Sequence, residues 1–275
     1  MIRGAMGLRL ALCQHKSDIG DVNANLNKIM AVISQTRSDV YIFPELFLTG
    51  HGTDYASLST DVQYAVDKMR LWCIEKDIAI LVGSPSYSTN GIRNSALFIT
   101  PSEVVKYDQL YLSRFETRAE KAFVRGDRPI ISKFKDITFG FSICYDIFFP
   151  EIYRNYALAC SDVNICIAAS SSQYRQLFER ILPARSLENL LYTVFVNGAG
   201  GEGDNRLWGS SRLVGPMGNT LSELEEDEGV LCVYVDKEVV RNARKDKRHL
   251  EDRRIDIAWI PDEHQSFEKE CDTLR

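Results

Sequence analysis

One cysteine of this sequence, Cys144, stands where a strand is predicted to end and a helix to begin. The apolar stretch from Ile137 to Ile143 is typical of a strand, and a helix is predicted to begin near Pro150. The strand fixes the backbone, and the positive end of a nearby helix favours a thiolate. Cys144 is therefore a candidate nucleophile. A buried structural cysteine is the competing interpretation, because free cysteine is among the most buried residue types.

A cysteine that attacks a carbonyl or nitrile carbon needs a base, donors for the oxyanion and an acid for the leaving nitrogen. None of the four histidines has a context that suggests the base. Glu45 in FPELFLTG follows the predicted strand Val40 to Phe43, and α/β sheets place functional groups at the carboxyl ends of strands. A carboxylate with a raised pKa can be the base. A surface loop carboxylate is the alternative interpretation of Glu45.

These two residues need a scaffold, and the hydrophobic pattern predicts strands and helices in alternation. The alternation breaks near Thr100, where two strands follow each other, so mixed sheets covered by helices are expected and the fold class is α/β. The predicted strands are Leu8–Gln14, Val40–Phe43, Ile78–Val82, Ser95–Thr100, Val104–Leu112, Ile137–Ile143, Val163–Ala168, Thr193–Asn197, Ser211–Val214 and Gly229–Val235. The predicted helices are Asn23–Thr36, Asp61–Glu75, Pro150–Leu158 and Leu177–Leu191.

Length and composition bound the class of protein. The chain has 275 residues, of which 45% are hydrophobic and 26% charged, so one large globular domain is expected. The net charge of -5 and a pI near 5.5 argue against a nucleic-acid partner. Basic residues gather only between Arg241 and Arg254, where acidic residues are interspersed. A solvated or interface face is predicted there.

The cysteine count and the hydropathy indicate the compartment. Seven cysteines are an odd number, and none shows CxxC spacing, so reduced thiols are expected. No cofactor or metal site is expected, because a His-rich cluster is missing from the sequence. There is no apolar run of about 18 residues and no signal-peptide pattern, which predicts a cytoplasmic protein without a membrane partner.

Five segments, in order along the chain, carry a family resemblance. They are GDVNANLNKI from Gly20, FPELFLTG around Glu45, ICYDIFFPEIYR around Cys144, RSLENLLYTVFVNGAG from Arg185 and GSSRLVGPMG from Gly209. Together they resemble the signature segments of the nitrilase superfamily of carbon-nitrogen hydrolases, in particular its amidases and N-carbamoyl amino acid amidohydrolases. The resemblance runs from Leu8 to about Asp256.

The resemblance implies a four-layer αββα sandwich with mixed β-sheets, a catalytic set of Glu, Lys and Cys, and a homodimer or higher homo-oligomer. Residues 1–275 are expected to form one such domain, with 257–275 as a C-terminal tail. Carried over residue by residue, Cys144 matches the nucleophile and Glu45 the general base. The backbone amide of Tyr145 matches an oxyanion donor, and Ser170 and Ser171 match a segment that lines the pocket.

The match to the family's lysine fails. That lysine lies in a segment of the type YxKxHL, which corresponds to Tyr107–Leu112 here, so Gln109 occupies the lysine position. Lys106 is three residues away and points to the opposite face of a strand, so it cannot simply substitute. Lys121 is too remote to place by pattern. The additional glutamate of many members is matched best by Glu120, with Glu116 as a second candidate.

With Gln109 in place of the lysine, the sequence does not decide whether the site hydrolyses its substrate. A glutamine amide donates a hydrogen bond but supplies no charge, and losing one oxyanion donor typically costs about 100- to 1000-fold in rate. The implied reaction is hydrolysis of a small amide or carbamoyl compound through a thioester, with an amide favoured over a nitrile. Three interpretations remain: a slow or altered enzyme, a pocket that contains another cation, or a catalytically impaired protein that binds a small molecule or a partner.

Neighbouring residues carry predictions of a structural kind. Cys160 and Cys166 are expected to pack in the core. Asp146 and Glu151 are expected to cap the helix that follows Cys144 through its N-terminal amides. Arg185 and Glu188 have the i, i+3 spacing of an ion pair.

Overall fold

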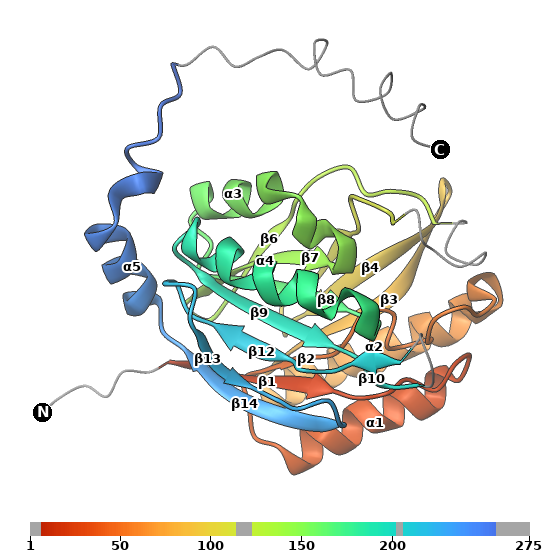
Figure 1. Cartoon of the computed structure of the whole chain (residues 1–275). Coiled ribbons are helices and arrows are strands. Elements are labelled where there is room, and N and C mark those ends of the chain that lie inside the picture. Colours follow the sequence, from red (N-terminus) through yellow and green to blue (C-terminus); the bar gives the residue numbers. More distant parts are fainter. Residues whose placement is uncertain (1–6, 114–122, 202–205, 257–275) are drawn as a thin grey trace, which may run out of the picture.

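The computed structural model describes residues 7–113, 123–201 and 206–256 (Figure 1). Its strands are β1 (Leu8–Gln14), β2 (Val40–Ile42), β3 (Ala79–Ser88), β4 (Gly91–Ile99), β5 (Val104–Asp108), β6 (Ile131–Phe134), β7 (Ile137–Ile143), β8 (Val163–Ala168), β9 (Tyr192–Asn197), β10 (Ala199–Gly200), β11 (Leu207–Trp208), β12 (Arg212–Val214), β13 (Thr220–Glu223) and β14 (Gly229–Val235). Its α-helices are α1 (Val22–Gln35), α2 (Ser59–Lys76), α3 (Pro150–Leu158), α4 (Arg175–Leu187) and α5 (Lys237–Asp246), and its 3-10 turns are η1 (Tyr55–Leu58), η3 (Cys144–Phe148), η4 (Ser172–Tyr174) and η6 (Arg248–Leu250).

Two six-stranded sheets form the middle of the molecule, in the orders β14-β1-β2-β3-β4-β5 and β13-β12-β9-β8-β7-β6. In each sheet three neighbouring strands are parallel, β1, β2 and β3 in one and β7, β8 and β9 in the other, and the remaining pairs are antiparallel. Figure 1 shows α1 and α2 outside the first sheet and α3 and α4 outside the second. This arrangement confirms the predicted αββα sandwich with mixed sheets.

Alternating side chains along each strand divide the core into layers. In β1, Leu8, Leu10 and Leu12 lie in the cluster between the two sheets, while Ala11 and Cys13 lie in the cluster beneath α1 and α2. A third cluster joins β8 and β9 to α3 and α4. The central strands of each sheet are therefore buried on both faces, which is why β1, β2, β7, β8 and β9 are rich in continuous apolar residues.

Both α1 and α2 expose apolar side chains directly beside their buried faces. Leu26, Ile29 and Ile33 of α1 are buried, but Met30 is 44% exposed. In α2, Ala65 and Met69 are buried, but Tyr64 is 51% exposed. Each lies one residue from a buried position, and one residue is a rotation of about 100° around a helix.

The largest difference in bounds is the β3–β4 hairpin. Its strands run nine pairs, from Ile80 opposite Ile99 to Ser88 opposite Gly91. The predicted strands covered only the apolar halves, since the polar residues around Ser84–Ser88 lack the apolar pattern. In the other direction, β5 ends at Asp108 and not at Leu112. The elements β6, β13 and α5 were not predicted, because each is short or strongly charged.

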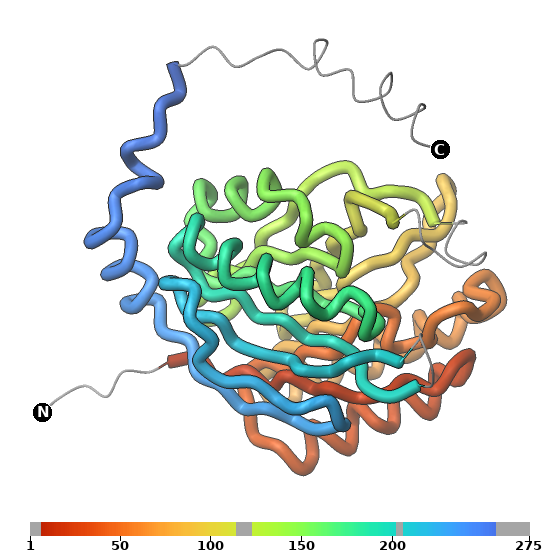
Figure 2. The backbone as a smooth tube through the Cα atoms, viewed as in Figure 1, coloured from red at the N-terminus to blue at the C-terminus, as the bar shows by residue number. Residues whose placement is uncertain are grey.

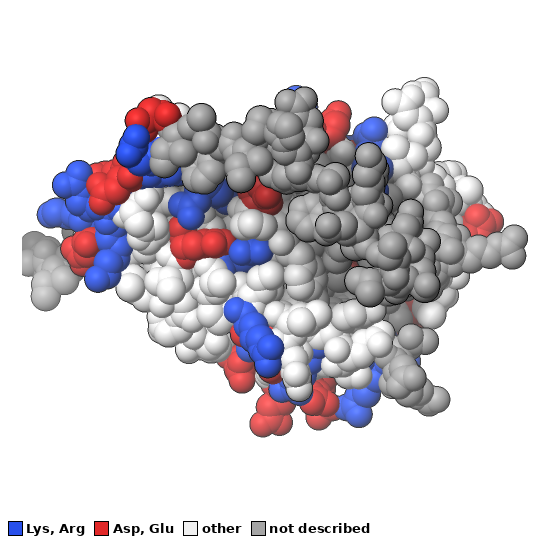
Figure 3. Space-filling view, turned by 45° about the horizontal axis from the view of Figure 1, so that its top comes forward, with Lys and Arg blue, Asp and Glu red and all other residues white. Residues whose placement is uncertain are grey.

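The first and the last described strands are neighbours in the first sheet. Figure 2 shows β14 beside β1, and their seven residue pairs are antiparallel. Beyond them, α5 and η6 carry several of the basic residues for which a solvated or interface face was predicted. These residues form local ion pairs such as Arg241 with Glu238 and Arg248 with Glu251. Figure 3 shows blue and red residues intermixed on this side of the molecule.

Within the described ranges, no helix has the length and hydropathy to cross a membrane.

Candidate active site

Glu45 lies in a tight bend directly after β2. Its side chain is buried, with 7% exposure, and Leu46 beside it has a left-handed φ of 48°. The bend rests against Gly83 of β3, where a Cβ would lie 2.3 Å from the Leu46 nitrogen and 2.4 Å from the Pro44 oxygen. Only glycine permits this approach. The surface-loop interpretation of Glu45 is therefore wrong, since the bend carries the carboxylate into the interior.

Two donors orient the Glu45 carboxylate. Asn94 Nδ2 donates to Oε1 at 2.7 Å, and the backbone amide of Ala169 donates to Oε2 at 2.9 Å. Asn94 comes from β4, and Ala169 follows β8 in the other sheet. The carboxylate therefore spans the two sheets at the carboxyl ends of β2 and β8.

Cys144 follows β7 and is the first residue of η3. It is partly exposed, and its φ of 44° is left-handed, a conformation uncommon for a residue other than glycine. Burial of the sulfur raises the pKa of the Cys144 thiol well above its ordinary value, and the charge of Glu45 and a hydrogen bond with that carboxylate raise it further. The backbone amide of Ala169 opposes the shift. At rest, the site holds a thiol beside a carboxylate.

Gln109 reaches the same cluster from just beyond β5. Its side chain is 4% exposed. Its Nε2 donates to the carbonyl oxygen of Ile143 at 3.1 Å, and its Oε1 accepts from Asn94 Nδ2 at 3.0 Å. Lys106 is exposed, and its ammonium lies 3.6 Å from the Asp108 carboxylate. The neutral amide of Gln109, and not Lys106, is thus placed beside the residue that precedes Cys144.

Asp146 does not cap α3, so that prediction is wrong. No side chain caps α3, whereas Asp146 is completely buried and faces the chain beyond β5. It accepts hydrogen bonds from the Tyr107 hydroxyl at 2.7 Å, the Tyr111 amide at 2.9 Å and the Ile143 amide at 3.0 Å. Burial raises the pKa of Asp146 to about 7, and these hydrogen bonds oppose the increase. Asp146 ties the turn at Cys144 to the segment that carries Gln109.

The predicted ion pair of Arg185 and Glu188 is confirmed, with Nη1 2.8 Å from Oε1. Arg185 does more than pair, because Nε donates to the Ile147 carbonyl at 2.8 Å and Nη2 to the Phe148 carbonyl at 3.2 Å. It is 6% exposed. Arg185 therefore holds the end of η3 against α4.

Ser170 and Ser171 follow β8, one and two residues beyond Ala169. Ser170 is 3% exposed, and its backbone amide donates to Asn197 Oδ1 at 2.8 Å. Its Oγ is buried without a hydrogen-bond partner among the described residues. Ser171 is partly exposed, and its Oγ accepts from Gln173 at 3.2 Å. Tyr145 is also partly exposed, with its ring edge-on to Phe149 at 5.4 Å.

Some of the remaining predicted residues lie outside the described ranges, and the two other predicted core cysteines differ in burial. Glu116, Glu120 and Lys121 lie outside the described residues, as does the predicted tail 257–275. Cys166 is buried as predicted, but Cys160 is exposed, because the chain turns at the end of α3 with a φ of 60°. In the part of the chain that the structure describes, no group of three or more His, Cys, Asp or Glu could hold a metal.

Sequence reasoning missed Asn94 as part of this cluster. It contacts both Glu45 and Gln109, yet no motif of the sequence marks it. Its position follows from the hairpin register, in which Ser95 lies opposite Asp108 and the next residues along, Asn94 and Gln109, face each other. Only the pairing of β4 with β5 could have revealed it.

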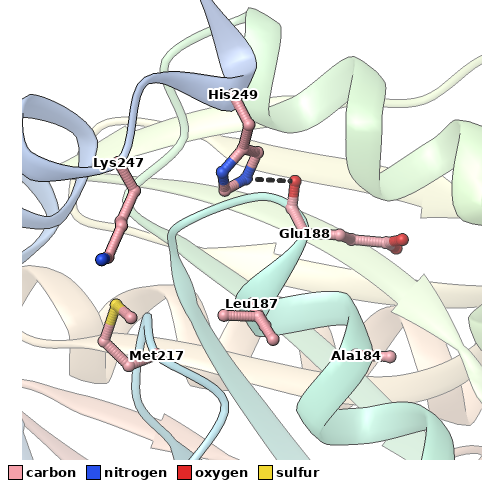
Figure 4. Close-up of a pocket in the computed structure, with 6 residues that line it drawn as sticks. All are labelled: Ala184, Leu187, Glu188, Met217, Lys247 and His249. Atoms are coloured by element: carbon pink, nitrogen blue, oxygen red, sulfur yellow. Dashed lines mark hydrogen bonds between the residues drawn. The ribbon is translucent and has the colours of Figure 1, made fainter.

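A hollow of about 430 Å³ lies at the other end of the second sheet (Figure 4). Ala184, Leu187 and Glu188 from the end of α4, Met217 from the β12–β13 turn, and Lys247 and His249 line it. In Figure 4 one hydrogen bond joins these residues, between His249 Nε2 and the Glu188 carbonyl oxygen at 3.2 Å. Val214 before this turn pairs with Thr193 at the start of β9, whereas Cys144 follows the end of β7. The hollow is thus remote from Cys144.

Known proteins resemble the whole of this chain. The family model described as carbon-nitrogen hydrolase matches residues 9–245. An (R)-stereoselective amidase from Pseudomonas sp. is 27% identical over 96% of this chain and 97% of its own length. A 2-oxoglutaramate amidase from Paenarthrobacter nicotinovorans is 26% identical over 91% of this chain and 90% of its own length.

Solved structures agree with this similarity. A glutamate-to-glutamine variant of the amidase from Nesterenkonia sp. AN1, with the acetamide moiety of fluoroacetamide added covalently at the active-site cysteine, has a TM-score of 0.79 and 25% identity. The similarity covers 97% of this chain and 99% of that one. A CN-hydrolase superfamily protein from Xanthomonas campestris shares the fold, with a TM-score of 0.80 at 22% identity over 92% of this chain and 99% of that one. The sandwich fold, the family match and the amidase relatives agree, and this chain belongs to the carbon-nitrogen hydrolase family.

Proposed function

We propose that this protein is a cysteine-dependent hydrolase of small amides or carbamoyl compounds, with Cys144 as nucleophile, Glu45 as general base and Gln109 in place of the family's lysine. The observation that carries the proposal is the convergence of these three residues. They come from the ends of β7, β2 and β5. Asn94 donates to both Glu45 and Gln109, and Gln109 donates to the carbonyl of Ile143, the residue before Cys144. A structural cysteine would not need this arrangement.

The first chemical step is proton transfer from Cys144 to Glu45. The raised pKa of Cys144 keeps the thiol protonated until a base takes its proton, and the Glu45 carboxylate is within hydrogen-bonding reach. The sulfur then forms a bond to the amide carbon, and the carbonyl π electrons move to oxygen. The left-handed backbone of Cys144 stores strain at the residue that reacts, as is common at functional sites.

The oxyanion then needs donors. Tyr145 N–H lies in the first turn of η3, where backbone amides lack a partner within the turn. Gln109 uses one N–H on the Ile143 carbonyl, and its second N–H remains for the oxyanion. When the C–N bond breaks, the nitrogen leaves with the proton from Glu45. Water, deprotonated by Glu45, then hydrolyses the thioester and releases the acid.

An amide is proposed as the substrate. Both relatives named above are amidases, and a variant of the Nesterenkonia amidase carries a covalent adduct at its active-site cysteine. A carbamoyl compound has the same carbonyl carbon attached to nitrogen and fits the same step. We expect slow turnover, because the neutral amide of Gln109 stabilises the oxyanion less than the ammonium of a lysine does.

A small-molecule binding protein is the second candidate, and Gln109 is the observation that favours it. Both ends of its amide are engaged in the resting site, by Asn94 and by Ile143. Such a site can hold an amide through the same hydrogen bonds without completing hydrolysis.

The test is intact-mass detection of an acyl-enzyme after incubation with a panel of small amides and carbamoyl compounds. An adduct that appears in the unchanged protein and is absent from Cys144→Ala supports the hydrolase, with Cys166→Ala as the matched control at a buried neighbour. If no amide is hydrolysed and Cys144 gains no adduct across the panel, the hydrolase proposal fails.

Reversion of Gln109 separates the two candidates further. Gln109→Lys brings a positive charge to the Cys144 thiolate and the oxyanion, and we expect hydrolysis to increase about 10-fold or more. A folded Gln109→Lys protein with no gain in hydrolysis would favour the binding protein.

The homodimer and the cytoplasmic location implied at the start stay predictions. Light scattering after gel filtration measures the first, and fractionation of cells that contain the protein measures the second.

A further inference from the structure

Asn94 is the link between the two sides of the proposed site. The two hydrogens of its Nδ2 are directed to two different acceptors, Glu45 Oε1 at 2.7 Å and Gln109 Oε1 at 3.0 Å. The residue is 3% exposed, so water does not substitute for these bonds. Its Oδ1 is buried without a hydrogen-bond partner among the described residues. An unpaired buried carbonyl oxygen is costly, which indicates that the site is organised around the amino group of Asn94.

Glu45 and the Ile143 carbonyl accept hydrogen bonds at the two ends of this chain of contacts, and they fix the orientation of the side-chain amides of Asn94 and Gln109. An ionised carboxylate only accepts, so Asn94 must present Nδ2 to Glu45. The same Nδ2 then faces Gln109, which must present Oε1 to it. This places Gln109 Nε2 toward the Ile143 carbonyl, which also only accepts. The orientation of Gln109 is therefore set at one end by the Ile143 carbonyl and at the other by Glu45, through Asn94.

The backbone supports this pair of amides. The Gln109 amide donates to the Asn94 carbonyl at 2.9 Å, and the Gly126 amide donates to the Gln109 carbonyl at 2.8 Å. A Cβ on Gly126 would lie 2.3 Å from the Asp108 oxygen, so a side chain at this position would displace the segment before Gln109. The two side chains are thus held at a fixed separation.

We propose that Asn94 is a positioning residue for the reaction at Cys144, which stabilises the ionised carboxylate of Glu45 and aims the Gln109 amide. This rests on the proposed function of the site. A lysine at position 109 could not accept the second hydrogen of Asn94, because an ammonium only donates. Asn94 and Gln109 therefore act as a matched neutral pair.

The experiment measures the alkylation rate of Cys144 by iodoacetamide against pH, followed by intact mass, which needs no turnover. Asn94→Ala removes a donor from the Glu45 carboxylate, so the pKa of Glu45 rises. We expect the acid limb of the rate profile to move up by about one pH unit. Ser95→Ala is the matched control. Ser95 is the next residue of the same strand, and its hydroxyl contacts Asp108 at 2.5 Å. Its profile should not move.

A double-mutant cycle tests the second part of the proposal, that Asn94 aims the Gln109 amide. If Asn94 acts through Gln109, the rate effects of Asn94→Ala and Gln109→Ala at high pH are less than additive. Should Asn94→Ala fold poorly, Asn94→Asp keeps the shape of the side chain and places a second carboxylate beside Glu45. Its acid limb should move further in the same direction.

An unchanged acid limb in a folded Asn94 variant would overturn the proposal, as would fully additive effects in the cycle. These outcomes are distinct from failure of the hydrolase proposal. If the unchanged protein hydrolyses no amide but Asn94→Ala still shifts the alkylation profile, the positioning role stands and the catalytic role of the site does not.

Discussion

Two regions of this molecule differ in how their residues come together. Around Cys144 the side chains are buried and joined by hydrogen bonds, and close packing at Gly83 brings the bend of Glu45 against β3. Around Leu187 and Met217 there is more open space, but these side chains are 45% and 46% exposed, and one hydrogen bond joins the lining residues. The hollow is thus accessible space, whereas the buried polar groups around Cys144 converge on a thiol and a carboxylate.

The largest effect is expected when one charged side chain in each region is neutralised. Glu45→Gln removes the proposed base, and we expect amide hydrolysis to fall by about 100- to 10 000-fold. Lys247→Met removes a charge at the hollow and should leave the rate within about 2-fold. Steady-state hydrolysis of the best amide measures both. Equal losses in the two variants would remove the distinction between the regions.

The next test concerns the contact between the two regions. Arg185 reaches from α4, beside the hollow, to the carbonyls of Ile147 and Phe148 near Cys144. Arg185→Met leaves both buried carbonyls without this donor, and the free energy of unfolding should fall by about 2–4 kcal/mol. His249→Ala should cost less than about 0.5 kcal/mol. Urea unfolding measures these values, and a loss at His249 as large as that at Arg185 would contradict the comparison.

A smaller effect is expected in the dependence of stability on pH. Burial raises the pKa of Asp146 to about 7, above that of an unfolded aspartate. Between about pH 4 and pH 7 the folded state binds a proton that the unfolded state does not bind, so this group lowers stability as pH rises. Asp146→Asn should make the free energy of unfolding less dependent on pH in this window. Parallel curves for the two proteins would show that Asp146 is ionised in the fold.

The smallest effect is expected at the hollow itself. Leu187→Ala and Met217→Ala remove exposed apolar side chains, and each should leave the iodoacetamide rate of Cys144 unchanged and alter stability by less than about 0.5 kcal/mol. A change in the alkylation profile of either variant would show that the hollow is coupled to the site at Cys144.

The sequence predicted the apolar elements well. The bounds of β1, β7, α3, β8 and β14 agree with the prediction residue for residue, because each is a run of apolar or helix-forming residues between clear breaks. The residues matched to the family segments, Glu45, Gln109 and Cys144, also lie together.

Asn94 and the actual contacts of Asp146 could not be predicted. Both depend on pairing between distant segments: Asn94 on the register of β4 with β5, and Asp146 on the approach of Tyr107 and Tyr111 to the turn at Cys144. Periodicity describes one segment at a time, so it carries no information about which polar residue of a strand will face another strand. The polar half of the β3–β4 hairpin was missed for the same reason.

The pairing of β1 with β14 has a consequence for how the chain is made. Among the described strands, β1 is synthesised first and its antiparallel partner β14 last. Until that partner is synthesised, one edge of β1 exposes unpaired amide and carbonyl groups, which are a template for association with other strands. Closing such a distant pair is slow. The nascent chain therefore passes through a stage in which its first sheet is incomplete and an edge of β1 is open to other strands.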